Sequence, residues 1–339
     1  MSVAEAGAAV TTGVEQETHR DPAPRHVRRV PGEPRDLQRT FQLILATVWL
    51  LDAVLQLQPF MFTPGSNGFS GMLAGTANGP GWVAHSVTWN AGIVGHHPVP
   101  TNTAFALVQF LIAFGIVGKR TLKGALGLSI VWALGVWWFG EGQGAIFRGG
   151  ATPFGGGPGG VLFYAVLAVL LWPGGISDEP FVAARTIGVT AAKAVWVVVW
   201  GLLAVLSVVG AGRSSAALSG LVSNLDNGQP GWLHHLDGIA EKFFLHHGTP
   251  AAVLLCAVCV VVALAVFVPP RGTQAVLVLA VVVFAVIWVA VQNFGGILAG
   301  GATDPNSGLL VIILALTYWP LTADRPSSTP APVVAAPRA

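Results

Sequence analysis

A repeated pattern of tryptophan, proline and histidine constrains every fold that this chain can adopt. Two sets of residues match at a constant separation of 150 positions: Pro80, Trp82, His85, His96, His97 and Pro100 in the first copy, and Pro230, Trp232, His235, His246, His247 and Pro250 in the second. Two further pairs of segments match: Gly149–Thr152 with Gly300–Thr303, and Trp172-Pro173 with Trp319-Pro320. A chance match would not keep its register over so much sequence, so the pattern indicates an internal tandem duplication.

The composition places most of this chain in lipid. Hydrophobic residues make up 53% of it, charged residues only 9%, and the mean hydropathy is +0.67. Apolar runs predict eight transmembrane helices, at about 41–62, 101–118, 124–140, 159–173, 191–210, 251–268, 274–292 and 308–322. We therefore predict an all-α integral membrane fold, in which two parallel-repeat four-helix bundles carry external amphipathic segments.

The eight helices divide the chain into two membrane repeats and two tails. We predict repeats at 40–175 and 190–323, and disordered cytoplasmic tails at 1–39 and 324–339, which are too polar or too rich in proline to bury a core. Basic residues gather in alternate connections, at Lys119, Arg120, Lys123, Arg185, Lys193 and Arg271. The positive-inside rule then predicts a plasma-membrane protein with both termini in the cytoplasm. A net charge of +2 gives no reason to expect a nucleic-acid partner, so the lipid bilayer is the expected surrounding.

Each repeat has a long external connection with an amphipathic segment. Trp232, Ile239 and Phe243 recur at helical spacing, while Asp237 and Glu241 fall on the opposite face. This pattern predicts a helix that lies in the membrane interface with its aromatic face inward. The matching segment at 82–95 carries no charged residue, so we expect it to be buried more completely.

The paired histidines are candidate ligands on the external side. His85 and His96 are eleven residues apart, about three helical turns, so both share a face with Trp89 and are expected to point toward the apolar interior. Imidazoles on a buried face can bind copper, zinc or haem iron. The candidate metal ligands are His85, His96, His97, His235, His246 and His247. The alternatives are hydrogen bonds to helix ends, proton transfer, or hydrogen bonds to a quinone.

Two acidic residues within or beside predicted spans are the strongest candidates for chemistry. Asp52 lies inside the first span and Glu141 ends the third; an ionisable group at membrane depth is costly unless it is paired, hydrated or functional. We predict Asp52, Glu141 and His85 as catalytic residues. Gln56, Gln109 and Trp89 are predicted to bind a cofactor beside them, with quinone, haem or copper as candidates.

The second copy has no acid at the two matching positions. Leu203 stands opposite Asp52, and Gln292 stands opposite Glu141. This difference predicts that the first half carries any chemistry and that the second half is mainly scaffold. The competing interpretation is that Asp52 caps a kink or pairs with a nearby indole. Cys256 and Cys259 lie in an apolar span, where we expect inert packing.

The layout of each half resembles the DoxX/DoxD-like family of small four-helix membrane proteins. The resemblance is carried by the segment Trp49–Asp52 near the end of the first span and by the Pro-Gly-Trp segment before the second. It implies a quinone-facing redox role, and the family is linked to thiosulfate:quinone oxidoreduction. This chain departs from that pattern in being duplicated and in carrying histidine pairs.

Three functional classes follow from these patterns, and whether the chain is an enzyme stays open. The first is a quinone- or metal-linked membrane redox protein, served by a membrane redox partner. The second is a transporter or channel for a small molecule. The third is a non-catalytic subunit that docks an external protein on its histidine-bearing surface.

Overall fold

A computed structural model describes residues 36–174 and 179–321 of the chain. Within those ranges the regular structure is entirely helical, so the predicted all-α class is confirmed. The predicted tails lie outside the described residues, except that 37–39 form the first turn of a helix. The α-helices are α1 (Leu37–Leu55), α2 (Pro59–Phe62), α3 (Phe69–Gly75), α4 (Gly81–His96), α5 (Pro98–Val117), α6 (Leu122–Phe139), α7 (Gly160–Leu170), α8 (Ala184–Val208), α9 (Ser215–Leu225), α10 (Gly231–Leu264), α11 (Pro270–Ala290) and α12 (Asn306–Thr317).

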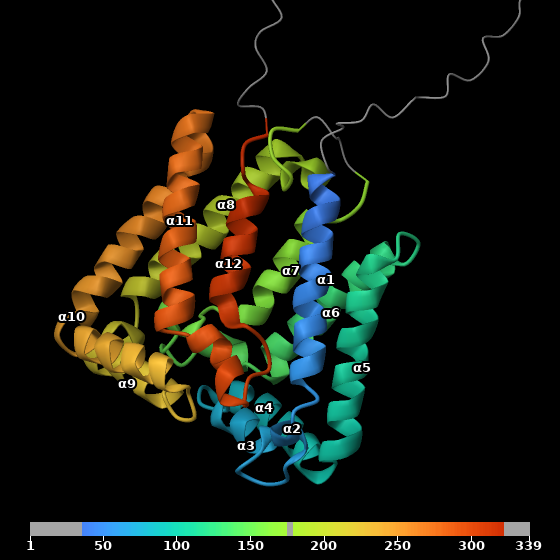
Figure 1. Cartoon of the computed structure of the whole chain (residues 1–339), viewed down its shortest axis with the longest axis vertical. Helices are drawn as coiled ribbons and strands as arrows, with labels where there is room; N and C mark the ends of the chain where they lie inside the picture. Colours follow the sequence, from blue (N-terminus) through green and yellow to red (C-terminus); the bar gives the residue numbers. More distant parts are fainter. Residues whose placement is uncertain (1–35, 175–178, 322–339) are drawn as a thin grey trace, which may run out of the picture. The chain divides into compact units, whose positions relative to one another are not determined.

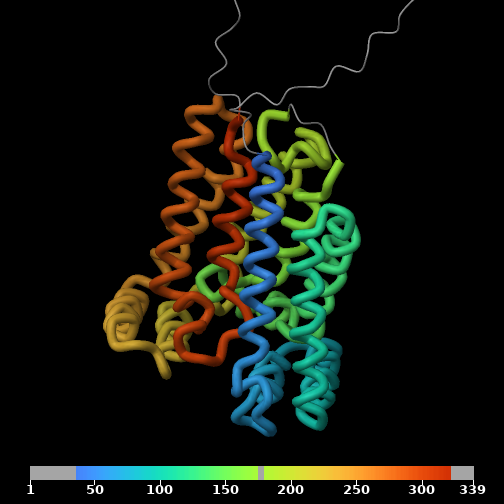
Figure 2. The backbone as a smooth tube through the Cα atoms, turned by 45° about the vertical axis from the view of Figure 1, so that its right-hand side comes forward, coloured from blue at the N-terminus to red at the C-terminus, as the bar shows by residue number. Residues whose placement is uncertain are grey.

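Five of the helical segments are long and apolar enough to cross a bilayer, as expected for a multi-pass membrane protein. They are α5, α6, α8, and the segments Gly231–Phe267 and Pro270–Ala299, which extend α10 and α11 by short 3-10 turns. Each of the eight predicted spans contains a helix. The helices in the other three, α1, α7 and α12, lie side by side in the middle of the arrangement (Figures 1 and 2).

Two of these central helices are short and almost wholly enclosed by protein. Most residues of α7 and α12 are buried, including Leu167 and Leu310 at 0% exposure. A helix of 12 residues rises about 18 Å, well short of a bilayer's ~30 Å hydrocarbon core. Both helices begin inside the protein, so groups at their N-termini face protein interior.

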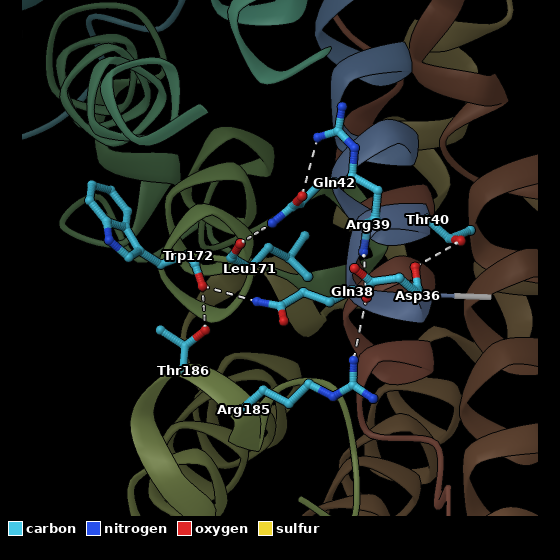
Figure 3. Close-up of polar contacts among 9 residues, drawn as sticks. All are labelled: Asp36, Gln38, Arg39, Thr40, Gln42, Leu171, Trp172, Arg185 and Thr186. Atoms are coloured by element: carbon cyan, nitrogen blue, oxygen red, sulfur yellow. Dashed lines mark hydrogen bonds and ion pairs between the residues drawn. The ribbon is translucent and has the colours of Figure 1, made fainter. Parts of the chain in front are cut away.

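Polar side chains of α1 tie the ends of neighbouring helices together (Figure 3). Gln38 donates to the carbonyl of Trp172 at 3.0 Å, and Gln42 donates to that of Leu171 at 2.9 Å. The guanidinium of Arg39 donates to the carbonyls of Ile116 and Val117 at the end of α5. The last carbonyls of a helix have no partner within the helix, so this network satisfies the C-terminal ends of α5 and α7.

Two tight turns with the same conformation follow α6 and α11. Left-handed φ values run through Gly142–Ala145 after α6, and through Asn293–Gly296 after α11. In front of each turn a tryptophan indole donates to a proline carbonyl: Trp137 to Pro158 at 2.8 Å, and Trp288 to Pro305 at 2.6 Å. These turns bring the chain back to the start of α7 and of α12.

The amphipathic segments form helices, but their predicted orientation is wrong. Trp232, Ile239 and Phe243 at the start of α10 are 57%, 55% and 50% exposed, whereas Asp237 is buried at 1%. Asp237 turns inward because the side-chain amide of Asn293 donates to its carboxyl at 2.8 Å. The matching helix α4 likewise exposes Trp82 and buries smaller valines. The aromatic faces thus point away from the protein core, where a membrane interface would receive them.

Candidate functional site

A cavity of about 530 Å³ lies between α1, α5, α6 and α7, and α3 and α4 line it from the outside. Its lining is mainly apolar and aromatic, with a few polar groups that converge on one wall. Asp52, Gln56, Gln109, Glu141 and Trp89 all line it, so the structure brings five of the predicted site residues together. A concave, mostly apolar cavity with convergent polar groups has the form of a small-molecule site.

Asp52 reaches the cavity from the middle of α1. Its side chain is 2% exposed, and its Oδ1 has no hydrogen-bond partner among the described residues. The Tyr164 hydroxyl of α7 lies beside it. One turn earlier, Trp49 packs against Tyr164 with tilted rings whose centroids are 4.4 Å apart, and its indole N–H donates to Ser129 at 3.0 Å. The Trp49 indole therefore does not pair with Asp52.

Glu141 follows the end of α6, and its carboxyl lies over the N-terminus of α7. The backbone N–H of Val161 donates to Oε1 at 3.2 Å, while Oε2 is buried and has no partner within residues 36–174 and 179–321. Burial, together with repulsion from Asp304, raises the pKa of Glu141 to about 8; the N–H of Val161 opposes that rise. A carboxyl with this pKa is mostly protonated at neutral pH and can donate a hydrogen bond.

Asp304 comes from the second half of the chain and lines the same cavity. Its Oδ1 accepts from the backbone N–H of Asn306 at the start of α12, at 2.7 Å, and its Oδ2 accepts from the Thr303 hydroxyl at 2.8 Å. Burial raises the pKa of Asp304, and those two hydrogen bonds oppose the rise. Glu141 and Asp304 thus cap the N-termini of the short helices α7 and α12, and both line the same cavity.

The two glutamines have different surroundings. The amide of Gln56 donates to Asn102 at 2.6 Å, and Asn102 donates in turn to the carbonyls of Pro98 and Met61, so Gln56 is held in a structural network. Gln109 is 7% exposed, and its Oε1 has no partner among the described residues. Gln109 is therefore the glutamine with a polar atom left for a ligand.

Unpartnered buried polar atoms concentrate at this cavity. Five residues that line it carry one each within the described part of the chain: Asp52, Gln109, Trp132, Glu141 and Tyr164. Leaving such an atom without a partner costs about 1–3 kcal/mol. A cluster of five around one apolar space indicates that the wall is arranged to hydrogen-bond something that enters it.

The cavity reaches the apolar outer surface of the helix bundle. Val131 and Leu128 on α6 line it and are 69% and 37% exposed, and Trp89 on α4 lines it at 58% exposure. These residues form an apolar rim on the outside of the bundle. A molecule dissolved in the bilayer would meet this rim before it met the acids.

A second, more polar cavity of about 320 Å³ adjoins the first. Glycine backbone and Arg148 line it, and it shares Thr76, Glu141, Thr303 and Asp304 with the apolar cavity. The two acids therefore stand in a wall between an apolar space and a polar one.

The histidines lie apart from this site, and their predicted burial is wrong. His85, His96, His97, His235, His246 and His247 are all exposed. His96 and His246 instead make hydrogen bonds to backbone carbonyls one turn earlier, those of Gly92 and Lys242. The described residues include no group of three or more His, Cys, Asp or Glu side chains placed to hold a metal ion. Of the three predicted catalytic residues, Asp52 and Glu141 line the cavity and His85 does not.

The sequence reasoning missed Asp304, Tyr164 and Trp132. A signal for Asp304 was present, because it directly follows the repeated Gly-Gly-Ala-Thr segment that ends at Thr303. Tyr164 carried a weaker signal as one of only two tyrosines in the chain. The view that the second half lacks acids at the site is corrected by Asp304. Cys256 and Cys259 are both free thiols, packed in α10.

Comparisons with protein-family models, with curated proteins and with solved structures found no match.

Proposed function

We propose that the apolar cavity binds a small molecule from the bilayer, and that this molecule is a quinone used in a membrane redox role. The observation that carries this proposal is the set of five unpartnered polar atoms on the wall of one apolar cavity. Quinone carbonyl oxygens accept hydrogen bonds, and the Tyr164 hydroxyl and the Trp132 indole N–H are donors. The apolar remainder of the lining suits a quinone ring and tail.

In this proposal the chain binds the quinone and gives it protons, and it does not supply the electrons. Reduction of a quinone adds two electrons and two protons, and Asp52, Glu141 and Asp304 are the carboxyl groups on the cavity wall that can give the protons. The electrons come from a membrane redox partner. The resemblance to DoxX/DoxD-like units, which the sequence suggested, agrees with this role.

Quinone binding is tested with the purified protein in lipid nanodiscs. Trp49, Trp89 and Trp132 line the cavity, so a soluble quinone such as decylubiquinone should quench tryptophan fluorescence with saturation. We expect Tyr164→Phe to weaken binding about tenfold, the effect of one hydrogen bond of ~1.4 kcal/mol. Tyr318→Phe is the matched control, because that hydroxyl donates to the carbonyl of Ala192 outside the cavity. Quenching that does not saturate, or that both variants leave unchanged, would refute the proposal.

A second candidate function is transport of a small molecule, and one observation favours it. Glu141 and Asp304 border both the apolar and the polar cavity, as expected for groups on a pathway. Flux of protons or solute into liposomes, lost in Asp304→Asn, would support this function. Absorbance spectra and metal analysis of the same protein test the haem and copper alternatives.

We further propose that the chain is a tandem repeat of two four-helix units with eight spans and cytoplasmic termini. The matching turns after α6 and α11 support the repeat, as do two equivalent caps: Val161 N–H on Glu141, and Gly308 N–H on Gln292 at 3.0 Å. The connections that carry Lys119 and Arg271 lie at the end of the bundle where α1 begins (Figure 1), which supports the orientation. Labelling of single cysteines from either side of intact cells tests it.

A further inference from the structure

The lining of the apolar cavity has acidic side chains and no basic ones among the described residues. Asp52, Glu141 and Asp304 line the apolar cavity, and none of the described residues that line it is a lysine, arginine or histidine. The ion pairs of the described residues lie elsewhere, between Arg185 and Asp36 and between His234 and Asp226. The three acids thus have no counter-ion from the described chain. A positively charged ligand would supply the counter-ion that these acids lack.

The rest of the lining suits a cation that carries apolar groups. Aromatic rings face the space from several helices, among them Phe105 and Trp132, which pack edge to face with centroids 5.4 Å apart. The face of an aromatic ring attracts a cation by about 0.5–2 kcal/mol. Apolar groups on the cation would bury against these rings and against the valine and leucine rim.

Two of the acids also adjoin a polar space to which a proton can pass. Glu141 and Asp304 line the polar cavity as well as the apolar one, together with the hydroxyl-bearing Thr76 and Thr303. Asp304 is the charged group that acts on Glu141, Asp52 and the Tyr164 hydroxyl line the same apolar cavity, and Arg148 lines the polar cavity. A proton that leaves Glu141 can therefore enter the polar cavity without crossing the apolar space.

We propose that the apolar cavity binds a lipophilic organic cation and that each cation that enters releases a proton to the polar cavity. This proposal rests on the proposed role of the cavity as a ligand site, and it names a substrate class beyond quinones. In the step, the O–H bond of the Glu141 carboxylic acid breaks and the proton passes to water beside Asp304. The carboxylate that remains pairs with the cation, so charge in the cavity is conserved. Release of bound cation reverses the step and takes up one proton.

The test compares two ions of the same size and opposite charge. Tetraphenylphosphonium and tetraphenylborate are titrated into the protein in phosphatidylcholine nanodiscs, with empty nanodiscs as the partition blank. The pKa of Glu141, about 8, implies that tetraphenylphosphonium binds about 100-fold more tightly at pH 9 than at pH 6. Calorimetry in buffers of different ionisation heat should show about one proton released per cation bound at pH 6.

Matched variants identify the group that responds. Glu141→Gln should lose the pH dependence and weaken cation binding at pH 9 by at least about tenfold. Glu241→Gln, the same change on α10 away from the cavity, should behave as the unaltered protein. Asp304→Asn gives a second variant if Glu141→Gln does not fold, and it should also reduce proton release.

Three results would overturn the proposal: equal binding of the two ions, cation affinity independent of pH, or no release of protons. Decylubiquinone binding is measured on the same preparations. Saturable quinone binding without cation binding would defeat this inference alone. If neither ligand binds, the proposed ligand site fails as well.

Discussion

Replacing Glu141 with glutamine should flatten the dependence of stability on pH. Glutamine keeps the oxygen that accepts the Val161 N–H, so the cap on α7 survives while the titrating proton is removed. The pKa of Glu141 is about 8 in the folded protein, against an ordinary value of 4.5. Between these two values the folded state holds a proton that the unfolded state has lost.

The sign and size of the effect follow from that difference. Glu141 leaves stability unaffected below about pH 4.5, lowers it as pH rises from 4.5 to 8, and causes no further loss above 8. The slope in that window is about −1.4 kcal/mol per pH unit, and the accumulated loss reaches at most about 5 kcal/mol. Asp304, whose pKa is raised too, adds a slope of the same sign that Glu141→Gln leaves in place.

The assay is thermal unfolding followed by tryptophan fluorescence between pH 5 and 9, in a detergent that keeps the protein monodisperse. We expect the unaltered protein and Glu241→Gln to lose stability toward pH 9, and Glu141→Gln to lose distinctly less. Identical pH profiles for Glu141→Gln and the unaltered protein would refute the reasoning, because they would mean that Glu141 is ionised in the folded state at neutral pH.

Three further substitutions test other parts of the structure. Arg39→Ala removes the donor to the last carbonyls of α5 and should cost about 1–3 kcal/mol of unfolding free energy, read from a denaturation midpoint. Asn293→Ala removes the donor to buried Asp237 and should cost about 2–3 kcal/mol, a loss that Asp237→Ala should partly restore in a double-mutant cycle. Gly159→Ala places a methyl group 2.3 Å from the Glu141 carboxyl at a φ of +118°, so it should displace that carboxyl and weaken ligand binding at least tenfold.

Two of these substitutions have a matched control in the chain. Arg271→Ala changes an exposed arginine and should leave the midpoint within about 0.5 kcal/mol. Gly201→Ala adds a methyl group where the structure has open space, within a helix, and should not weaken ligand binding. Additive effects of Asn293→Ala and Asp237→Ala would contradict the coupling of those two side chains.

Apolar runs in the sequence were enough to predict a helical membrane-type fold, because lipid-facing and core-facing residues are both hydrophobic. The same fact explains why the predicted orientation of the amphipathic helix was wrong. The amphipathic pattern at Trp232–Phe243 has two faces, but in a membrane protein the aromatic face turns outward and the polar Asp237 turns inward to meet Asn293. Local periodicity contains no information about that partner 56 residues away.

The candidate site, too, could be predicted only in part from the sequence. Asp52 and Glu141 stood out because acids beside apolar spans are costly, and both line the cavity. His85 attracted attention through the repeat, yet a repeated residue need not face the interior, and this one is exposed. Asp304 was missed because it precedes its helix in a loop, and only the tertiary fold brings that loop to Glu141.

Photoaffinity labelling with an azido-quinone tests the central claim most directly, that the three acids and the apolar cavity form one ligand site. We expect labelled peptides from α1 and α6 around Asp52 and Val131, protection by excess decylubiquinone, and loss of labelling in Asp52→Asn but not in Glu241→Gln. Labelling spread over the outer faces of α8 and α11, unaffected by competitor or by Asp52→Asn, would contradict it.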